Sequence, residues 1–122
     1  MRLFRATDLL ADPTPVPEPA RFFGAAFSSA IQSGTTDKVT TALIRLDPGS
    51  RGHWHFHADG QVIHVLRGTG LVGRRDAEPL QIAAGDTVWI EPGEEHWHGA
   101  SSEGLAQFAF SFGPITWLEP SP

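Results

Sequence analysis

The chain has 122 residues, enough for one compact domain with a buried core, and it contains no cysteine. Disulfides, thiolate metal ligands and thiol nucleophiles are therefore excluded, so any bound metal must be held by nitrogen and oxygen. The net charge of −5, with no basic cluster larger than the Arg74-Arg75 pair, argues against a nucleic-acid partner.

The N-terminal region lacks the apolar core of a secretion signal, and no later stretch is apolar over the length of a membrane span. We therefore expect a cytoplasmic protein with no membrane partner. Residues 8–11 can form a helical turn, but prolines at alternate positions from 13 to 19 favour an extended, Pro-rich arm over residues 1–21. Two readings are open for this arm: a disordered tail, or a segment packed across a partner subunit.

Residues 22–122 are expected to form a single domain built from strands. The sequence predicts strands at residues 25–32, 38–46, 54–57, 61–67, 70–73, 87–90, 95–99 and 105–112, with turn signals that include residues 33–34, 59–60 and 68–70. Thirteen glycines and ten prolines fit this many turns better than a helical bundle. The pattern predicts an all-β sandwich or barrel.

Three phenylalanines alternate along the last of these predicted strands. Phe108, Phe110 and Phe112 share one face of it, and Gln107 and Ser111 lie on the other. Because large apolar side chains are usually buried, we expect the phenylalanine face to form the core of the barrel.

All six histidines lie between positions 53 and 98, and they include a His-x-His pair. His55 and His57 project to the same side of an extended segment, because side chains on a strand repeat every two residues. Gln61 follows the turn at residues 59–60 and can project toward the same point, and His96 arrives from a distant segment. These four side chains are the predicted ligands of one divalent transition metal, with other coordination positions left open.

The segment that carries the first three of these ligands resembles the first of two paired motifs in the cupin superfamily. Gly49, His55, His57, Gln61 and Gly68 have its spacing, with glutamine where the superfamily usually has glutamate. Several ligands and glycines at fixed offsets make this a far more specific signal than an isolated glycine motif.

The second segment resembles the second cupin motif. Gly85, Gly93 and His96 match it, whereas Glu91 occupies the usual proline position and Ala100 the usual asparagine position. Small bacterial cupins related to carboxymuconolactone-decarboxylase-associated proteins look similar in the strings PGSRGHWHFHADGQ and PGEEHWHGA. Some relatives of that type are manganese-dependent hydroxynitrile lyases.

The resemblance implies a double-stranded β-helix, or jelly-roll, barrel of six to eight strands with the metal inside it. It also implies an enzyme of lyase type, in which the metal binds a substrate oxygen and promotes cleavage of a C–C or C–X bond. Those lyases carry a candidate base histidine on the strand after the second motif, whereas residues 105–112 contain no histidine. Lyase activity here would therefore need His53, His98 or metal-bound hydroxide instead.

A glutamine ligand changes the charge of the predicted site. Three imidazoles and an amide are neutral, so the centre keeps the full 2+ charge of the metal, which a glutamate would halve. This charge favours Lewis-acid chemistry over oxygen activation, because no ligand anion stabilises a higher oxidation state. The alternative role for Gln61 is a hydrogen bond to a metal ligand rather than to the metal itself.

The three remaining histidines are assigned from strand alternation. His53 has the parity of His55, and His98 has the parity of His96, so both are candidate catalytic acids or bases that face the cavity. His64 has the opposite parity to Gln61 and is expected to point away from the metal. Contact with solvent or with a metal ligand is the alternative role for each of the three.

Three functional classes are open at this stage. The first is a metal-dependent, lyase-type cupin enzyme that acts on a small oxygenated organic substrate. The alternatives are a metal-dependent dioxygenase, which would stop without oxygen, and a non-catalytic cupin that binds a small ligand. Imidazole-rich sites accept manganese, iron, nickel and zinc alike, so the sequence leaves the identity of the metal open.

Several features predict a homodimer. Trp54 and Trp97 face away from the predicted metal by alternation, and residues 112–118 form an apolar segment near the end of the chain. Together with the extended arm, these exposed apolar surfaces are typical of contacts between subunits.

Overall fold

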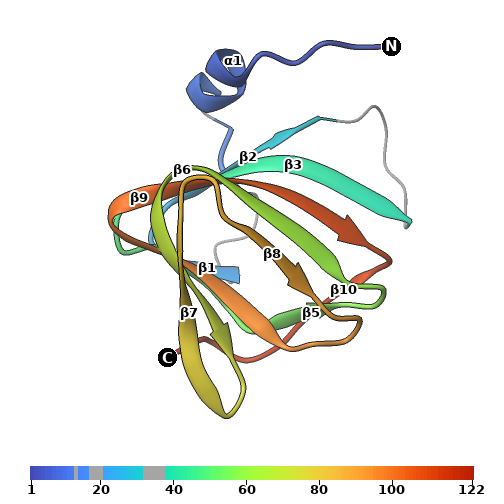
Figure 1. Ribbon diagram of the computed structural model, residues 1–122, viewed down its shortest axis with the longest axis vertical. Helices are drawn as coiled ribbons and strands as arrows, with labels where there is room; N and C mark the ends of the chain where they lie inside the picture. Colours follow the sequence, from blue (N-terminus) through green and yellow to red (C-terminus); the bar gives the residue numbers. More distant parts are fainter. Residues whose placement is uncertain (13, 17–20, 32–37) are drawn as a thin grey trace.

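The computed structural model describes residues 1–12, 14–16, 21–31 and 38–122. The described residues form one helix and ten strands: α1 (Ala6–Ala11), β1 (Phe22–Phe23), β2 (Ala26–Ala30), β3 (Val39–Leu46), β4 (Arg51–Gly52), β5 (His55–His57), β6 (Gln61–Arg74), β7 (Ala77–Ala83), β8 (Thr87–Ile90), β9 (His96–Phe112) and β10 (Ile115–Trp117). The ten strands belong to one hydrogen-bonded sheet that curls over on itself, as Figure 1 shows. This architecture confirms the predicted all-β barrel.

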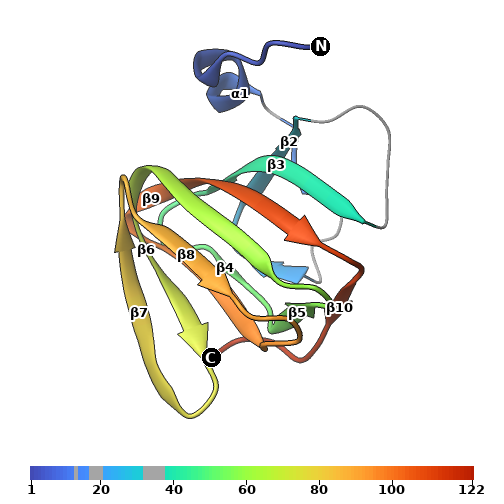
Figure 2. The same cartoon turned by 45° about the vertical axis from the view of Figure 1, so that its right-hand side comes forward.

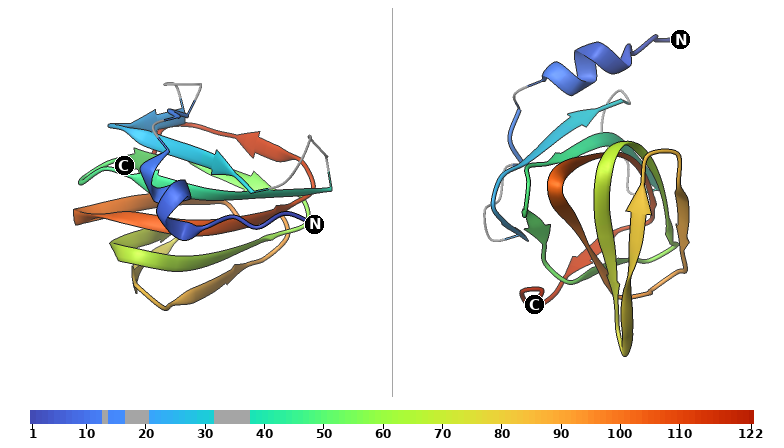
Figure 3. Two further views of the ribbon diagram at one scale, coloured as in Figure 1. Left: turned by 90° about the horizontal axis from the view of Figure 1, so that it is seen from above. Right: turned by 60° about the vertical axis from the view of Figure 1, so that its left-hand side comes forward.

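Two long antiparallel strands organise the sheet. β6 and β9 pair from Gln61↔Ser111 at one end to Arg74↔His96 at the other. The second half of β9 also pairs with β3, whereas its first half pairs with β4 and β5. On its other edge, β6 pairs first with β8 and then with β7. Because each long strand runs between two sets of neighbours, the sheet bends into a barrel, which the two views of Figure 3 make plain.

Each long strand joins two segments that the sequence analysis separates. The predicted turn at residues 68–70 is wrong, because the chain bulges between Gly68 and Gly70 and then continues as β6. Gly68 has a φ of +81°, and a Cβ atom there would lie 2.1 Å from the carbonyl oxygen of Gly104. A glycine pair of this kind serves a bulge as well as a turn, so the sequence signal alone does not separate the two.

Four strands were not expected from the sequence. β1, β4 and β10 contain only two or three residues each, too few to show an alternating pattern. β7 is mostly exposed and carries no apolar stripe, and among the described strands it pairs with β6 alone. It forms a hairpin with the end of β6 that extends away from the barrel (Figure 2). Strands of these two kinds lack the periodic signal on which sequence prediction depends.

The predicted orientation of β9 is also wrong. Gln107, Ala109 and Ser111 line the internal cavity, whereas Phe108 and Phe110 lie half-buried on the opposite face, with their rings stacked at 6.4 Å. Strand alternation fixes which side chains share a face but leaves open which face is internal. The inner face is polar here because it surrounds a cavity, and the phenylalanine face is partly covered from outside.

Apolar side chains pack inside the curled sheet beside that cavity. Ile63 and Val65 on β6 are fully buried, with exposed fractions of 0%. Burial of side chains of this size contributes roughly 1.5–3 kcal/mol each. Their cluster also contains Ala26, Leu46, Val72, Ile82, Ile90 and Leu105. Leu46 belongs both to this cluster and to the cavity wall, so the apolar core directly supports the site.

The N-terminal segment lies outside the barrel, above β2 and β3 in Figure 1. The expected helical turn at residues 8–11 is confirmed and extends back to Ala6. Leu9 is 8% exposed and packs with Leu43 and with Ala106. Pro15 forms an isolated antiparallel bridge with Phe27, and the prolines at 13, 17 and 19 lie outside the described residues. The division into an arm and a barrel at residue 21, and a contact of the arm with a partner, stay predictions.

Within the described parts of the chain, α1 is the one helix, and it is far too short to cross a bilayer.

The short connection between β5 and β6 positions part of the site, because it sets the direction in which Gln61 leaves the turn. Its glycine, Gly60, has a φ of +95°. An added Cβ would lie 2.8 Å from the carbonyl oxygen of Ile90 and 2.7 Å from the Trp89 ring.

We therefore expect Gly60→Ala to destabilise the fold more than Gly85→Ala does. Gly85 has nearly the same φ, +93°, but open space around its Cβ position. Gly85→Ala therefore lowers the free energy of unfolding only through backbone strain at positive φ, by about 1–2 kcal/mol. Gly60→Ala adds a steric clash to the same backbone strain. Urea denaturation followed by tryptophan fluorescence measures both free energies of unfolding, and equal losses in the two variants would contradict this account.

Candidate metal centre

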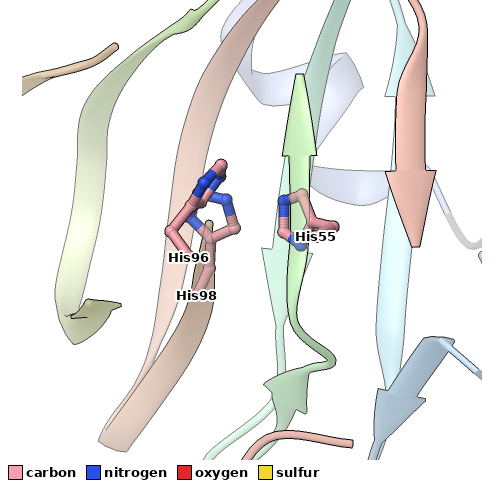
Figure 4. Close-up of side chains that lie close together, drawn as sticks. All are labelled: His55, His96 and His98. Carbon is pink, nitrogen blue, oxygen red and sulfur yellow. The ribbon is translucent and has the colours of Figure 1, made fainter. Parts of the chain in front are cut away.

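Two neighbouring strands bring four histidines together inside the barrel. His55 and His57 lie two residues apart on β5, both buried, with Phe56 between them turned to the other face. His96 begins β9 and pairs across the sheet with His55, and His98 follows it on the same side. Figure 4 shows His96 and His98 projecting from one strand toward His55 on another.

The rings of His55, His96 and His98 form the tightest part of this group. One nitrogen of each lies within 4.8 Å of the others, a separation that permits a common metal ion. The His55 ring centroid lies 4.3 Å from that of His96 and 5.2 Å from that of His98. His57 lies slightly further away, with its ring centroid 5.3 Å from that of His55 and 5.7 Å from that of His96.

Backbone carbonyl groups fix the protonation pattern of two of these rings. The Nδ1–H of His55 donates to the carbonyl oxygen of His53 at 2.9 Å, and the Nδ1–H of His96 donates to the carbonyl oxygen of Glu94 at 2.8 Å. A neutral imidazole has a single N–H, so each Nε2 is left with a lone pair directed into the site. A hydrogen bond from the far nitrogen to a carbonyl is the usual support of a metal-binding histidine.

Gln61 faces His96 in an arrangement that a cation explains. Its Nε2 donates to Ser111 Oγ at 2.8 Å, which turns its Oε1 toward His96 Nε2 at 3.1 Å. With its Nδ1–H donated to Glu94, a neutral His96 leaves both atoms of this contact as acceptors, so the contact is a hydrogen bond only when His96 Nε2 also carries a proton. Rotation of the amide by half a turn would let Gln61 donate to His96 and accept from Ser111. The observed orientation is instead the one in which oxygen and nitrogen can share a metal ion.

His57 and His98 contribute buried nitrogens without hydrogen-bond partners among the described residues. His57 has two such nitrogens and His98 one, its Nδ1. An unpaired polar atom in the interior costs about 1–3 kcal/mol relative to a paired one. Metal coordination or a bound ligand would remove that cost.

Burial keeps the imidazoles of the site neutral. Desolvation lowers the pKa of His57 to about 4, with the nearby His96 as the second cause. Desolvation likewise holds the pKa of His55 and of His98 well below the ordinary 6.5, again with His96 next in importance, and it lowers that of His96 itself. Neutral imidazole is the form that binds a metal, so no proton has to leave at neutral pH.

The other two histidines lie apart from this group. His53 is buried against Phe23, with ring centroids 4.7 Å apart, and does not line the cavity. The catalytic role of His53 therefore stays a prediction, and its ring does not border the cavity beside the other histidines. His64 points away from the site, as expected from its parity, and its Nδ1 lies 2.8 Å from Thr87 Oγ1.

Trp54 and Trp97, next to the motif histidines, turn away from them but are not exposed. Trp54 and Trp97 are 7% and 3% exposed and form an edge-to-face pair at 6.5 Å. Arg75 and Arg51 lie over their outer faces. These tryptophans are therefore not the exposed apolar surface that the sequence predicts, because arginine side chains of the same chain cover them, and their place in a subunit interface stays a prediction.

A cavity of about 520 Å³ opens beside the histidines and has the size of a small-molecule site. Its wall contains His55, His57, Gln61 and His98 together with apolar side chains from β3 and β9. It also contains polar residues that the sequence analysis did not assign to the site, Gln107, Ser111, Arg21 and Trp117.

Part of this additional lining left a signal in the sequence. Gln107 and Ser111 are polar residues that alternate with phenylalanines. If the polar face of this strand is taken as the internal one, the sequence places both residues in the cavity. Gln107 is 2% exposed, and its Oε1 has no partner among the described residues. Arg21 and Trp117 lie far from both motifs, and only the fold brings them to the site.

A family model described as the cupin domain matches residues 42–112, more than half of the chain. The (R)-mandelonitrile lyase of Granulicella tundricola is 43% identical over 63 residues, which are 52% of this chain and 48% of that protein. The aligned region thus spans about half the length of the lyase.

Solved structures agree on the fold. A cupin-like protein from Thermotoga maritima superposes with a TM-score of 0.79 and 29% identity, over 84% of this chain and 83% of that one. An acetylacetone dioxygenase from Acinetobacter johnsonii gives a TM-score of 0.72 and 19% identity, over 89% and 74% of the two chains. The polyketide cyclase RemF from Streptomyces resistomycificus gives 0.71 and 18%, over 99% and 87%.

Proposed function

The chain belongs to the cupin family, and from this premise we propose that it is a metal-dependent enzyme that cleaves a C–C or C–X bond in a small oxygenated molecule. The observation that carries the proposal is the pair of facing acceptors, Gln61 Oε1 and His96 Nε2, at 3.1 Å. Two acceptors in contact inside a protein repel each other unless a proton or a metal cation lies between them. The similarity to a mandelonitrile lyase over half the chain supports the reaction class.

The proposed ligands are His55, His57, Gln61 and His96. His55 and His96 offer lone pairs whose tautomers are fixed, and Gln61 offers an oxygen whose direction is fixed by Ser111. His57 completes the set with a buried imidazole that has no other partner among the described residues. Nitrogen and oxygen donors of this kind suit manganese, iron, nickel or zinc, and the hydroxynitrile-lyase resemblance favours manganese.

Bound there, the metal would supply Lewis-acid polarisation of a substrate oxygen. The groups of the chain then have separate tasks. His98 is neutral, lies beside the ligands and lines the cavity, so its imidazole can accept a proton from the substrate. Gln107 offers an amide oxygen that has no partner among the described residues to a hydroxyl or N–H group of the same molecule. The apolar walls from β3 and β9 exclude water around both.

Two alternatives remain distinct from this proposal. A metal-dependent dioxygenase would use the same ligands and would stop in the absence of oxygen, whereas a lyase would not. A non-catalytic cupin would bind a small ligand without turnover. The neutral donor set favours the lyase, because no anionic ligand stabilises a higher oxidation state of the metal.

We expect His55→Ala, His57→Ala and His96→Ala each to lose tight metal binding and to keep the folded barrel. Each removes one of four ligands, and losses of about 100-fold or more in affinity are expected, because even partners of the ligands matter by about 10- to 100-fold. His64→Ala is the matched control, since it removes a histidine on β6 that points away from the site. Elemental analysis after dialysis measures metal content, and circular dichroism measures the fold.

The same experiment separates His57 from His98. If His98→Ala loses the metal and His57→Ala keeps it, the fourth ligand is His98 and the proton-accepting role assigned to it is wrong. Wild-type metal content in any two of the three ligand variants would contradict the site as a whole.

Gln61→Glu is expected to raise metal affinity and to slow a Lewis-acid reaction. A carboxylate binds a divalent cation better than an amide, but it lowers the net charge of the centre by one and so polarises substrate oxygen less. An oxygenase should keep or increase its turnover with the same change. Calorimetric metal titration measures the affinity, and turnover with and without oxygen shows whether the substitution slows or speeds the reaction. Unchanged affinity would show that Gln61 is not a ligand.

The assembly that we propose is a homodimer. The outer face of β9 presents the half-buried Phe108, Phe110 and Phe112, and next to Phe112 lies Trp89, which is 50% exposed. An apolar sheet face of this kind is typical of contacts between copies of a chain. Sedimentation at micromolar concentration should give twice the chain mass of 13.2 kDa, and Trp89→Arg should shift it toward the monomer. A monomer in the wild-type protein would refute the dimer.

A further inference from the structure

The histidine cluster has a supporting layer on the outer side of the sheet. His55 and His96 pair across β5 and β9, and both side chains are buried. The residues next to them in the chain, Trp54 and Trp97, turn to the other side and form an edge-to-face pair at 6.5 Å. Whatever fixes these tryptophans therefore also fixes the backbone that carries the two histidines.

Arg75 covers this layer from the tip of a hairpin. It lies in the two-residue turn between β6 and β7, directly after Arg74, whose Cα pairs with that of His96. The guanidinium carbon of Arg75 lies 3.8 Å from the centre of the Trp54 ring, a cation–π distance. A turn residue that belongs to neither histidine segment is thus placed directly behind the histidine pair.

Two carboxylates hold the guanidinium in this position. Its Nε–H donates to Glu95 Oε2 at 2.6 Å, and its Nη2–H donates to Glu119 Oε1 at 2.6 Å. Glu95 immediately precedes His96. The segment around Glu119 binds the backbone of Trp54, whose N–H donates to the Glu119 carbonyl oxygen at 3.1 Å and whose carbonyl oxygen accepts from the N–H of Leu118 at 2.8 Å. One guanidinium therefore joins three segments that are distant in the sequence.

We propose that Arg75 is a positioning residue for the metal centre, which holds the backbone beside His55 and His96 in the arrangement that a shared metal ion requires. The three charged side chains are between 38% and 56% exposed, so each ion pair alone contributes little. Their effect comes from joint action, because a rigid guanidinium fork bound to two carboxylates and one ring fixes all three segments together. The proposal rests on the proposed function for the metal itself, which Arg75 does not contact.

The sign of the effect separates positioning from a simple effect of charge. Arg75 and its two glutamates carry a formal charge of −1, and removal of the arginine leaves −2. Through space, the additional negative charge attracts a divalent cation and raises its affinity. Loss of positioning lowers the affinity instead, because the ligands must then be ordered when the metal binds. The two effects have opposite signs for the same substitution.

Calorimetric titration of Mn²⁺ into the metal-free full chain measures this sign. Arg75→Gln should lower the Mn²⁺ affinity by about 3- to 10-fold, a loss in the range of two exposed ion pairs and one cation–π contact. Arg75→Lys keeps the charge without the fork and should restore part of the affinity. The electron paramagnetic resonance spectrum of bound Mn²⁺ should also change in Arg75→Gln, because the ligands are then held less uniformly.

Arg74→Gln is the matched control. It removes the same charge from the neighbouring position of the same hairpin, but the Arg74 guanidinium donates to the carbonyl oxygen of Glu78 within that hairpin. The Mn²⁺ affinity of this variant should equal or slightly exceed that of the wild-type protein. An equal loss of affinity in Arg74→Gln and Arg75→Gln would overturn the proposal.

Hydrogen exchange in the metal-free protein keeps the positioning role distinguishable from the metal site. The Trp54 and His96 backbone N–H groups should exchange about 3- to 10-fold faster in Arg75→Gln and at the wild-type rate in Arg74→Gln. Faster exchange supports the positioning of the histidine pair even if metal binding fails. Unchanged exchange, an unchanged or higher Mn²⁺ affinity in Arg75→Gln, or a lower affinity with an unchanged Mn²⁺ spectrum would each overturn it.

Discussion

The arrangement on which the rest depends is the convergence of unprotonated acceptors inside the barrel. Two backbone carbonyls hold the only N–H of His55 and of His96, and Ser111 turns the oxygen of Gln61 toward His96. With both imidazoles in these tautomers, the three acceptors repel one another until a proton or a metal cation lies among them. Such a cluster is expensive in a metal-free protein and favourable in a metal-bound one, so metal binding and stability of the folded chain are thermodynamically linked.

The long strands explain how the chain keeps these groups in place. β9 carries His96 and His98 in its first half and Gln107 and Ser111 in its second, so one strand forms both the histidine cluster and the opposite part of the cavity wall. The same strand anchors the amide of Gln61 through Ser111. The apolar cluster around Ile63 and Val65 supports it from within the barrel. A rigid wall of this kind positions side chains more accurately than a loop does.

Sequence and structure agree where the signal is local. His55, His57 and His96 could be assigned to one site because strand alternation and fixed motif spacing determine their direction. Which side of β9 is internal could not be assigned, because apolar residues on one face and polar residues on the other suit either orientation around a cavity. Arg21 and Trp117 could not be assigned for another reason. Arg21 precedes a two-residue strand and Trp117 ends a three-residue strand, and such short segments reach the site only through pairing between distant parts of the chain.

Anomalous diffraction from manganese-loaded crystals tests the central claim most directly. The account predicts a single strong peak inside the barrel, about 2.0–2.3 Å from the Nε2 atoms of His55 and His96 and from Gln61 Oε1. In metal-free crystals, the Gln61 amide should rotate so that its nitrogen donates to His96. A peak distant from all three atoms, or no peak after loading, would contradict the account.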